Sequence, residues 1–266
     1  PEANGFVMSA NKWWMTNPNA ENKKNLPTGY YEQTLLGKNL DWIRCYAQGL
    51  YTYVQEGKPV MSEYDDTLMA ADFLEPDISL PIQVGVDFGL TPAAIFGQRT
   101  RKGTWNILHE LVTFDMGLER FGEMLKSELA SKFPKFEVLV HGDPAGMKRD
   151  EIYEVTAFDH LRSIGLTARP TASNDFRVRR EAGAMPMNRL IEGKPGLLVD
   201  KRCQRLRKAL SGGYHFKRVQ ISGGERYKDA PNKNEHSHVG DAFMYLLLGG
   251  GEHKRLTRGT NNKFKQ

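Results

Sequence analysis

The order of the predicted strands and helices indicates a mixed α/β fold, in which helices cover both faces of one central sheet. Three apolar segments at 83–87, 93–99 and 104–113 are separated by short turns and predict an antiparallel meander. After this meander, strand patterns alternate with amphipathic helix patterns. Such alternation adds further strands to the same sheet and places helices on both of its faces.

The first strand of the meander, residues 83–87, ends in the carboxylate of Asp87. Gly89, Thr91 and Pro92 then give a turn signal before the next apolar segment begins. An unpaired buried carboxylate is costly, so an acid at the end of an apolar strand indicates a use for its charge. The alternative is that Asp87 only caps the turn.

The elements after the meander follow the same alternation. We expect helices at 117–131, 150–164, 176–192, 200–210 and 239–248, strands from Phe136 to the acid Asp143 and at 166–170 and 197–199, and a hairpin at 213–228. Before the meander, residues 1–57 are rich in Asn, Lys, Tyr and Trp, with predicted helices at 30–36 and 40–49. This composition suggests a linker or the end of another domain.

Composition limits the classes of protein to consider. The chain has 266 residues, 39% of them hydrophobic, and a formal net charge of +5, which permits a nucleic-acid partner without requiring one. Cys45 and Cys203 lie far apart with no motif spacing, which favours a reducing compartment and argues against a disulfide scaffold or a cysteine-rich zinc site. The N-terminus shows no signal pattern, and the apolar run 242–248 is too short for a membrane span. We therefore expect a soluble cytoplasmic protein.

Two further acids stand in positions comparable to that of Asp87. Asp143 ends a later apolar strand, and Pro144 and Gly146 then turn the chain away. Asp241 lies in the first turn of the final predicted helix. Binding sites in such sheets form beyond the carboxyl ends of parallel strands, so the three acids are expected to gather there. Each acid alone has a simpler explanation, as a turn residue or as a helix N-terminal acid favoured by the helix dipole.

Gathered carboxylates repel one another unless a cation lies between them. Oxygen ligands without cysteine favour Mg²⁺ or Mn²⁺ over zinc. Two such ions about 4 Å apart suit phosphodiester cleavage, because one activates water and the other stabilises the leaving oxygen. Replacing any one of Asp87, Asp143 and Asp241 with Asn should then leave the metal-free stability equal or raised, because repulsion is relieved.

The three acids lie within three motifs. The motifs are Val84-Gly85-Val86-Asp87-Phe88-Gly89, His141-Gly142-Asp143-Pro144-Ala145-Gly146 and His236-Ser237-His238-Val239-Gly240-Asp241-Ala242-Phe243-Met244-Tyr245. Together they resemble the nuclease domain of the large terminase subunits of tailed bacteriophages. The third motif is the most specific, and the resemblance covers roughly residues 58–250.

The resemblance implies an RNase H-like fold and an endonuclease that cuts concatemeric viral DNA during genome packaging into the capsid. It implies that Asp87, Asp143 and Asp241 are the catalytic residues and the ligands of two Mg²⁺ or Mn²⁺ ions. The implied partners are double-stranded DNA and, in the full-length protein, an ATPase domain, the small terminase subunit and the portal of the procapsid. The implied location is the host cell cytoplasm, with no membrane partner.

The resemblance also divides the chain. Residues 1–57, including Leu26-Pro27-Thr28-Gly29-Tyr30-Tyr31, resemble the end of the family's ATPase domain and its linker. Residues 58–252 correspond to the nuclease domain, and 253–266 form a basic flexible tail. An ATPase motor needs a loop of the form GxxxxGK[ST], and Gly37-Lys38-Asn39 lacks both the upstream glycine and the Ser/Thr. We therefore expect no ATP hydrolysis.

Glu110 and His238 are possible auxiliary residues. We expect the strand that carries Glu110 to neighbour the Asp87 strand, where Glu110 is either an outer metal ligand or an exposed or paired strand acid. His238 precedes Asp241 by three residues and either orients a ligand, contacts phosphate or only neighbours the helix start. His236 and His238 also raise the possibility of zinc, which fits poorly beside two other acids.

Basic residues suggest where DNA phosphates would bind. The hairpin carries Lys217, Arg218, Arg226 and Lys228 and leads directly into the Asp241 motif, so we favour it as the DNA contact. The helix near 176 carries Arg177, Arg179 and Arg180, which are either further DNA contacts or a solvated helix face. No segment resembles a module that reads bases, so sequence-tolerant cleavage is expected.

Three other functions remain open from the sequence. The first is another enzyme of the same fold, an integrase or a junction resolvase, for which a different third motif is expected. The second is an actin-like or sugar-kinase-like ATPase, which needs two large lobes and a second glycine-rich phosphate turn. The third is a DNA-binding or assembly module without catalysis, in which the acids are structural. Metal-dependent nicking of plasmid DNA separates the third from a nuclease.

Overall fold

The computed structural model describes residues 57–89, 91–147, 155–219 and 226–252, the backbone of two short strands before them, and three single residues before position 31. The two strands, β1 (Val7–Ser9) and β2 (Lys12–Thr16), pair antiparallel, and the sequence does not predict them. The helices expected at 30–36 and 40–49, apart from Tyr30, and the tail at 253–266 lie outside the described residues. The domain boundary at residue 57 stays a prediction.

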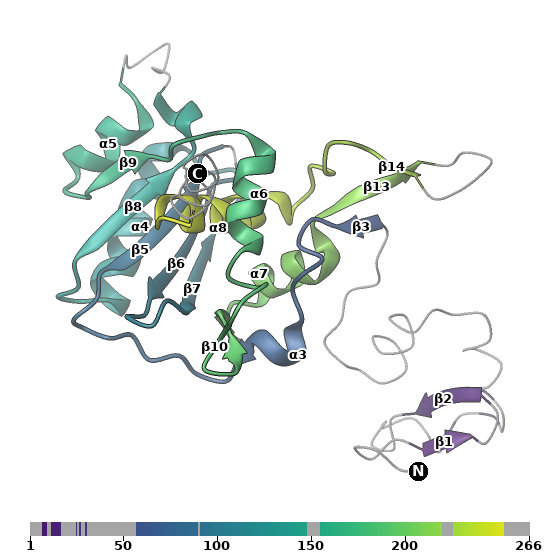
Figure 1. Cartoon of the computed structure of the whole chain (residues 1–266). Coiled ribbons are helices and arrows are strands. Elements are labelled where there is room, and N and C mark those ends of the chain that lie inside the picture. The colour runs from purple at the N-terminus through teal and green to yellow at the C-terminus, as the bar shows by residue number, and fades with distance from the viewer. Residues whose placement is uncertain are drawn as a thin grey trace, which may run out of the picture.

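Among the described residues, seven strands form one mixed sheet (Figure 1). Their spatial order is β4 (Ala70–Ala71), β12 (Leu197–Asp200), β7 (Trp105–Val112), β6 (Ala93–Arg99), β5 (Ile82–Asp87), β8 (Val138–Gly142) and β9 (Ala168–Pro170). The predicted meander is confirmed, because β5, β6 and β7 are antiparallel neighbours. β8 pairs parallel with β5 and β9 pairs parallel with β8, as the strand and helix alternation requires.

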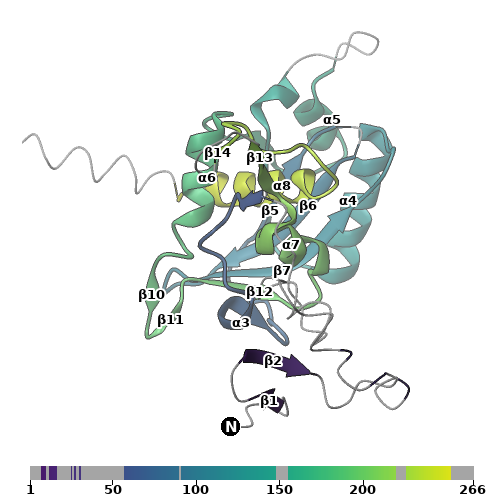
Figure 2. The same cartoon turned by 90° about the vertical axis from the view of Figure 1, so that its right-hand side faces the viewer.

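Helices cover both faces of this sheet, which confirms the predicted mixed α/β class (Figure 2). The helical segments are α3 (Asp66–Met69), α4 (Leu118–Lys132), the 3₁₀ turn η3 (Pro144–Met147), α5 (Ala157–Ser163), α6 (Phe176–Ala184), α7 (Gln204–Lys208), the π-helical turn η4 (Ala209–Gly213) and α8 (Ser237–Gly249). α4 and α5 pack on one face through apolar residues such as Phe121 and Phe158. α8 packs on the other face, and α6 packs against α8.

Strand β5 presents different residues to its two faces. Ile82, Val84 and Val86 point into the apolar cluster under α4 and α5. Gly85 and Asp87 alternate with them and therefore face α8. A Cβ atom at Gly85 would lie 2.2 Å from the Ala242 carbonyl oxygen, so the missing side chain lets the backbone of α8 approach the strand directly. This close approach fixes the position of α8 above the end of β5.

Two predicted helices are shorter than expected. The helix predicted at 176–192 ends at Ala184, because Pro186 cannot continue a helix. The chain then forms a small hairpin from β10 (Leu190–Ile191) and β11 (Lys194–Pro195), whose turn residues Glu192 and Gly193 have φ of 53° and 77°. The helix predicted at 150–164 is described from Ala157 onwards, with Thr156 and Asp159 forming a capping box.

The predicted hairpin at 213–228 is confirmed in its strands. β13 (His215–Val219) pairs antiparallel with β14 (Arg226–Tyr227), and β13 also pairs with β3 (Gly57–Pro59). This small sheet extends away from the central sheet (Figure 1). The expected tip at Ser222-Gly223-Gly224 lies outside the described residues. The hairpin therefore stands beside the start of α8, where the third acid motif begins.

Candidate active site

Two of the predicted acids lie side by side at one edge of the sheet. Asp87 is the last residue of β5, and Asp143 directly follows β8. In this parallel pair Val86 lies opposite Gly142, so the next residue on each strand is an acid. Adjacent strands are about 5 Å apart, and equivalent positions share a face, so both carboxylates lie at this edge on the α8 side. The predicted parallel pairing of the two acid strands is confirmed.

Asp241 approaches the same edge from helix α8. The helix begins at Ser237, so Asp241 lies in its second turn rather than its first, beyond the free amides at the helix N-terminus. The helix dipole therefore does not account for this acid. Asp241 is 2% exposed and Asp87 is 7% exposed. Burial raises the pKa of Asp87, and the nearby charge of Asp241 raises it further, because two carboxylates this close repel each other.

The carboxylate of Asp241 is held by three donors. Its Oδ1 accepts from Nη1 of Arg179 at 3.1 Å and from the hydroxyl of Tyr214 at 3.2 Å. Its Oδ2 accepts from Nζ of Lys233 at 2.5 Å. Both oxygens of this acid are thus engaged by groups of the protein, two of which are positively charged.

Arg179 is buried at this point and not exposed on the helix surface. Its guanidinium lies over the Tyr245 ring at 4.6 Å from the centroid and over the Phe176 ring at 5.8 Å. Burial would lower the pKa of Arg179, but Asp241 raises it, so the side chain stays charged. The Tyr245 hydroxyl donates to Oδ1 of Asn174 at 2.7 Å. Burial raises the pKa of Tyr245, and the charge of Asp143 raises it further. Arg179 and Tyr245 therefore connect the surroundings of two of the acids.

Arg179 and Arg180, which the sequence suggests as DNA contacts, have other partners in the structure. Arg179 has a side-chain exposure of only 8% and is occupied by Asp241. Nε of Arg180 donates to the Val60 carbonyl at 3.0 Å, and its Nη2 pairs with Glu63. Of the three arginines of α6, Arg177 alone is exposed. The spacing of Phe176, Arg179 and Gly183 along one helix face is a sequence signal for the burial of Arg179.

His238 lies beside Asp87. Its Nδ1 is 2.8 Å from Oδ2 of Asp87, and this hydrogen bond raises the pKa of His238. The same bond lowers the pKa of Asp87 and so works against the larger effect of burial. His238 is therefore a partner of Asp87, and its role in orienting a metal ligand stays a prediction.

Glu110 has a structural partner instead of a place among the acids. Its two carboxylate oxygens accept from the backbone amides of Arg205 and Leu206 at 2.9 and 2.8 Å. These amides belong to the first turn of α7, where the N-cap residue Cys203 provides no side-chain hydrogen bond. Glu110 therefore caps α7 from strand β7. Strand β6 lies between β7 and β5, so the expectation that the Glu110 strand neighbours the Asp87 strand is wrong.

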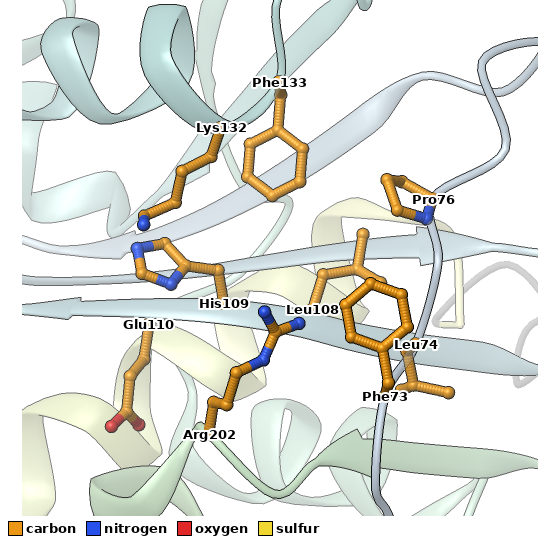
Figure 3. A pocket seen from close by; sticks show the side chains of 9 residues that line it. All are labelled: Phe73, Leu74, Pro76, Leu108, His109, Glu110, Lys132, Phe133 and Arg202. Carbon is orange, nitrogen blue, oxygen red and sulfur yellow. The ribbon is translucent and has the colours of Figure 1, made fainter.

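A cavity of about 480 Å³ lies beside β7, and Glu110 is one of its lining residues. It is lined by residues of β7, the end of α4, the segment before β5 and the segment between β12 and α7: Phe73, Leu74, Pro76, Leu108, His109, Glu110, Lys132, Phe133 and Arg202 (Figure 3). His109 points towards Lys132, whereas the Glu110 carboxylate points to the other side of the strand. None of the three predicted catalytic acids lines this cavity.

The four basic hairpin residues that are predicted to contact DNA lie on the surface. Lys217, Arg218, Arg226 and Lys228 are all exposed on β13, β14 and the residue after β14. Lys233, between this hairpin and α8, contacts Asp241, and the sequence reasoning missed it. Its position eight residues before Asp241 gives no periodic signal, because the segment between them is a loop followed by a helix start.

The acids fit a hard cation only in part. Among residues 57–89, 91–147, 155–219 and 226–252, no group of three or more His, Cys, Asp or Glu side chains is arranged to hold a metal ion. Asp241 instead pairs with Arg179 and Lys233. Asp87 and Asp143 remain as adjacent oxygen donors, and the buried charge of Asp87 lacks full compensation, which suits a divalent cation.

Comparison with solved structures identifies the fold. The nuclease domain of the P22 large terminase matches with a TM-score of 0.54 and 12% identity, over 74% of this chain and 94% of that domain. The large terminase of a thermophilic bacteriophage matches with a TM-score of 0.53 and 16% identity, over 84% of this chain. This chain spans about half the length of that second terminase, 52% of it.

At these identities the likeness establishes the fold, which is that of large terminase nuclease domains and is RNase H-like, as the motif resemblance implied. No family model matches the sequence, and no curated protein matches it. Within the described residues, no helix is both long and apolar enough to cross a membrane.

Proposed function

We propose that this chain is a metal-dependent DNA endonuclease that cuts concatemeric viral DNA during genome packaging. One observation carries the proposal: Asp87, Asp143 and Asp241 converge on one edge of a sheet whose fold is that of terminase nuclease domains. This edge lies at the carboxyl ends of the parallel strands β5 and β8, where sheets of this kind place their sites. Three acids from separate elements are more than a turn or a helix cap requires.

Asp87 and Asp143 would hold a divalent ion, whose chemistry is to activate a water molecule and to polarise the scissile phosphate. His238 fixes the orientation of Asp87 through the 2.8 Å contact. Arg179 fixes Asp241 from within the core. Burial raises the pKa of both Tyr214 and Tyr245, so both phenols stay protonated and act as hydrogen-bond donors in the site.

DNA would approach along the hairpin. Lys217, Arg218, Arg226 and Lys228 offer four exposed positive charges on the segment that leads into the Asp241 motif. Arg177 adds a charge from the start of α6. Contacts to phosphates release counterions, so binding should weaken steeply as salt rises. In a longer protein, an ATPase domain, the small terminase subunit and the portal would be the partners of this nuclease, in the cytoplasm of the host.

The decisive assay is nicking of supercoiled plasmid DNA with Mg²⁺ or Mn²⁺, with EDTA as the metal-free control. Asp143→Asn should lower the rate by about 1,000-fold or more, which corresponds to about 4 kcal/mol of barrier. Glu123→Gln removes an exposed acid of α4 and should leave the rate unchanged. Nicking by the Asp143 variant, or nicking in EDTA, would contradict the proposal. ATP hydrolysis by the chain would favour the actin-like alternative.

The proposed DNA surface has its own test. Replacing Lys217, Arg218, Arg226 and Lys228 together with Ala should weaken DNA binding and lower its dependence on salt. The matched control removes four other exposed charges, Arg101, Lys102, Arg120 and Lys126, which lie away from the hairpin. Equal loss of affinity in the two variants would mean that net charge, and not the hairpin, governs binding.

A further inference from the structure

The positive charges of the site are distributed unevenly among its three acids. Asp241 pairs with both Arg179 and Lys233. Asp87 contacts His238, and Oδ1 of Asp143 accepts from the backbone amide of Ala145 at 2.8 Å. Arg179 and Lys233 therefore compensate the charge of Asp241 on α8. The charges of Asp87 and Asp143 on the strands receive less compensation.

The two cations differ in how firmly they are held. The Arg179 side chain is 8% exposed and lies against two aromatic rings, so it cannot leave Asp241 without opening the core. The Lys233 side chain is 66% exposed and reaches Asp241 from the solvent side. A divalent ion that ligates Asp241 would have to take the place of Lys233, because Oδ1 already accepts from Arg179 and Tyr214.

The charges of the site indicate how many ions it needs. Asp241 already pairs with the two positive charges of Arg179 and Lys233. Asp87 and Asp143 carry the other two negative charges, and His238 beside Asp87 is the further group there that can take up a proton. One divalent ion between Asp87 and Asp143 is then enough to compensate the rest, and a second would meet an excess of positive charge. This is consistent with the described residues, which contain no three-ligand group.

We propose that the site binds a single divalent cation between Asp87 and Asp143, and that the ammonium of Lys233 occupies the place at Asp241 that a second ion would take. This inference rests on the proposed nuclease function and differs from the expectation of two ions. Lys233 is then a substrate-facing cation, whose remaining N–H donors are directed to a phosphate oxygen. Arg179 is a positioning residue, because it acts through Asp241.

The test counts bound ions and does not require activity. Mn²⁺ is titrated into the metal-free chain and followed by calorimetry and by the electron paramagnetic resonance of the free ion. The wild type should bind one ion per chain. Lys233→Met removes the ammonium and keeps the length of the side chain, so a second ion should bind. Lys233→Arg restores the charge and should return the count to one.

Lys228→Met is the matched control, since it removes an exposed lysine of the hairpin and leaves the Lys233 contact with Asp241 in place. It should leave the count at one, and thermal melting should show that both Met variants are folded. Two ions in the wild type, or one ion in Lys233→Met, would overturn the inference while the plasmid assay still supports a nuclease. No bound ion in any variant would overturn both this inference and the proposed metal dependence.

Discussion

The two faces of strand β5 show two ways of filling a protein interior. Ile82, Val84 and Val86 meet the apolar side chains of α4 and α5, where contact needs only matching shape. Gly85 and Asp87 meet α8, where charged groups are buried beside the apolar residues. On the first face a substitution leaves a cavity, and on the second it leaves a charge without its partner. The difference predicts distinct responses to mutation, salt and pH.

The largest effect is expected on the apolar face. Phe158 is fully buried and packs edge-on against Phe88 at 5.3 Å between ring centroids. Phe158→Ala should lower the free energy of unfolding by about 4 kcal/mol, because it removes a large apolar side chain and leaves a cavity. Chemical denaturation in EDTA measures the change. A loss that disappears at low pH would mean that this face is not governed by packing.

The next effect sharpens the contrast on the polar face. Asp241→Asn should lower the free energy of unfolding by about 3 kcal/mol, because it strands the buried guanidinium of Arg179. This replaces the expectation from sequence that all three Asn variants keep or raise the stability. Arg179→Met combined with Asp241→Asn should recover part of the loss, since neither charge then remains. A fully additive double variant would show that the pair is not coupled.

A smaller effect concerns pH. His141 is fully buried, and burial together with Arg169 lowers its pKa to about 4. Between about pH 6.5 and 4 the unfolded chain binds a proton that the folded chain does not, so stability should fall by about 2 to 3 kcal/mol as the pH drops through this window. His141→Gln should remove this part of the pH dependence. Melting curves in EDTA across this range, with His160→Gln as a half-buried control, make the comparison.

The smallest effect has the opposite sign. Asp87→Asn should raise the free energy of unfolding by about 1 kcal/mol without metal, because burial and the Asp241 charge disfavour its ionised form. The lost hydrogen bond to His238 limits the gain. The increase should vanish at pH values below the pKa of Asp87, where the native carboxyl is already neutral. A decrease in stability at neutral pH would show that the His238 contact outweighs the cost of burial.

The parts of the fold that the sequence predicts are those with a local pattern. The alternation and turns of residues 83–113 predict β5, β6 and β7, and the acid that ends each of the two parallel strands predicts their common edge. Helix ends are predicted less well. The helix expected to reach residue 192 ends at Ala184, where Pro186 acts locally against the longer apolar pattern.

The surroundings of the acids depend on contacts between distant segments, and such contacts leave little trace in one sequence. Arg179 lies 62 residues from Asp241, and Glu110 lies 95 residues from the α7 amide that it caps. A run of three nearby arginines indicates a basic surface, although the helix period places one of them inwards. The proposed site residues are thus predictable by their position at strand ends, but their partners are not.

The burial of α8 has a consequence for how this protein can be altered. Every residue from Val239 to Leu248 is buried, so the position of Asp241 is set by the core. The hairpin of β13 and β14 belongs to a separate small sheet that projects from this core (Figure 1). The hairpin is therefore a module that can be exchanged. A graft between Val219 and Arg226 from another protein would change what the surface holds and would leave the geometry of the acids intact.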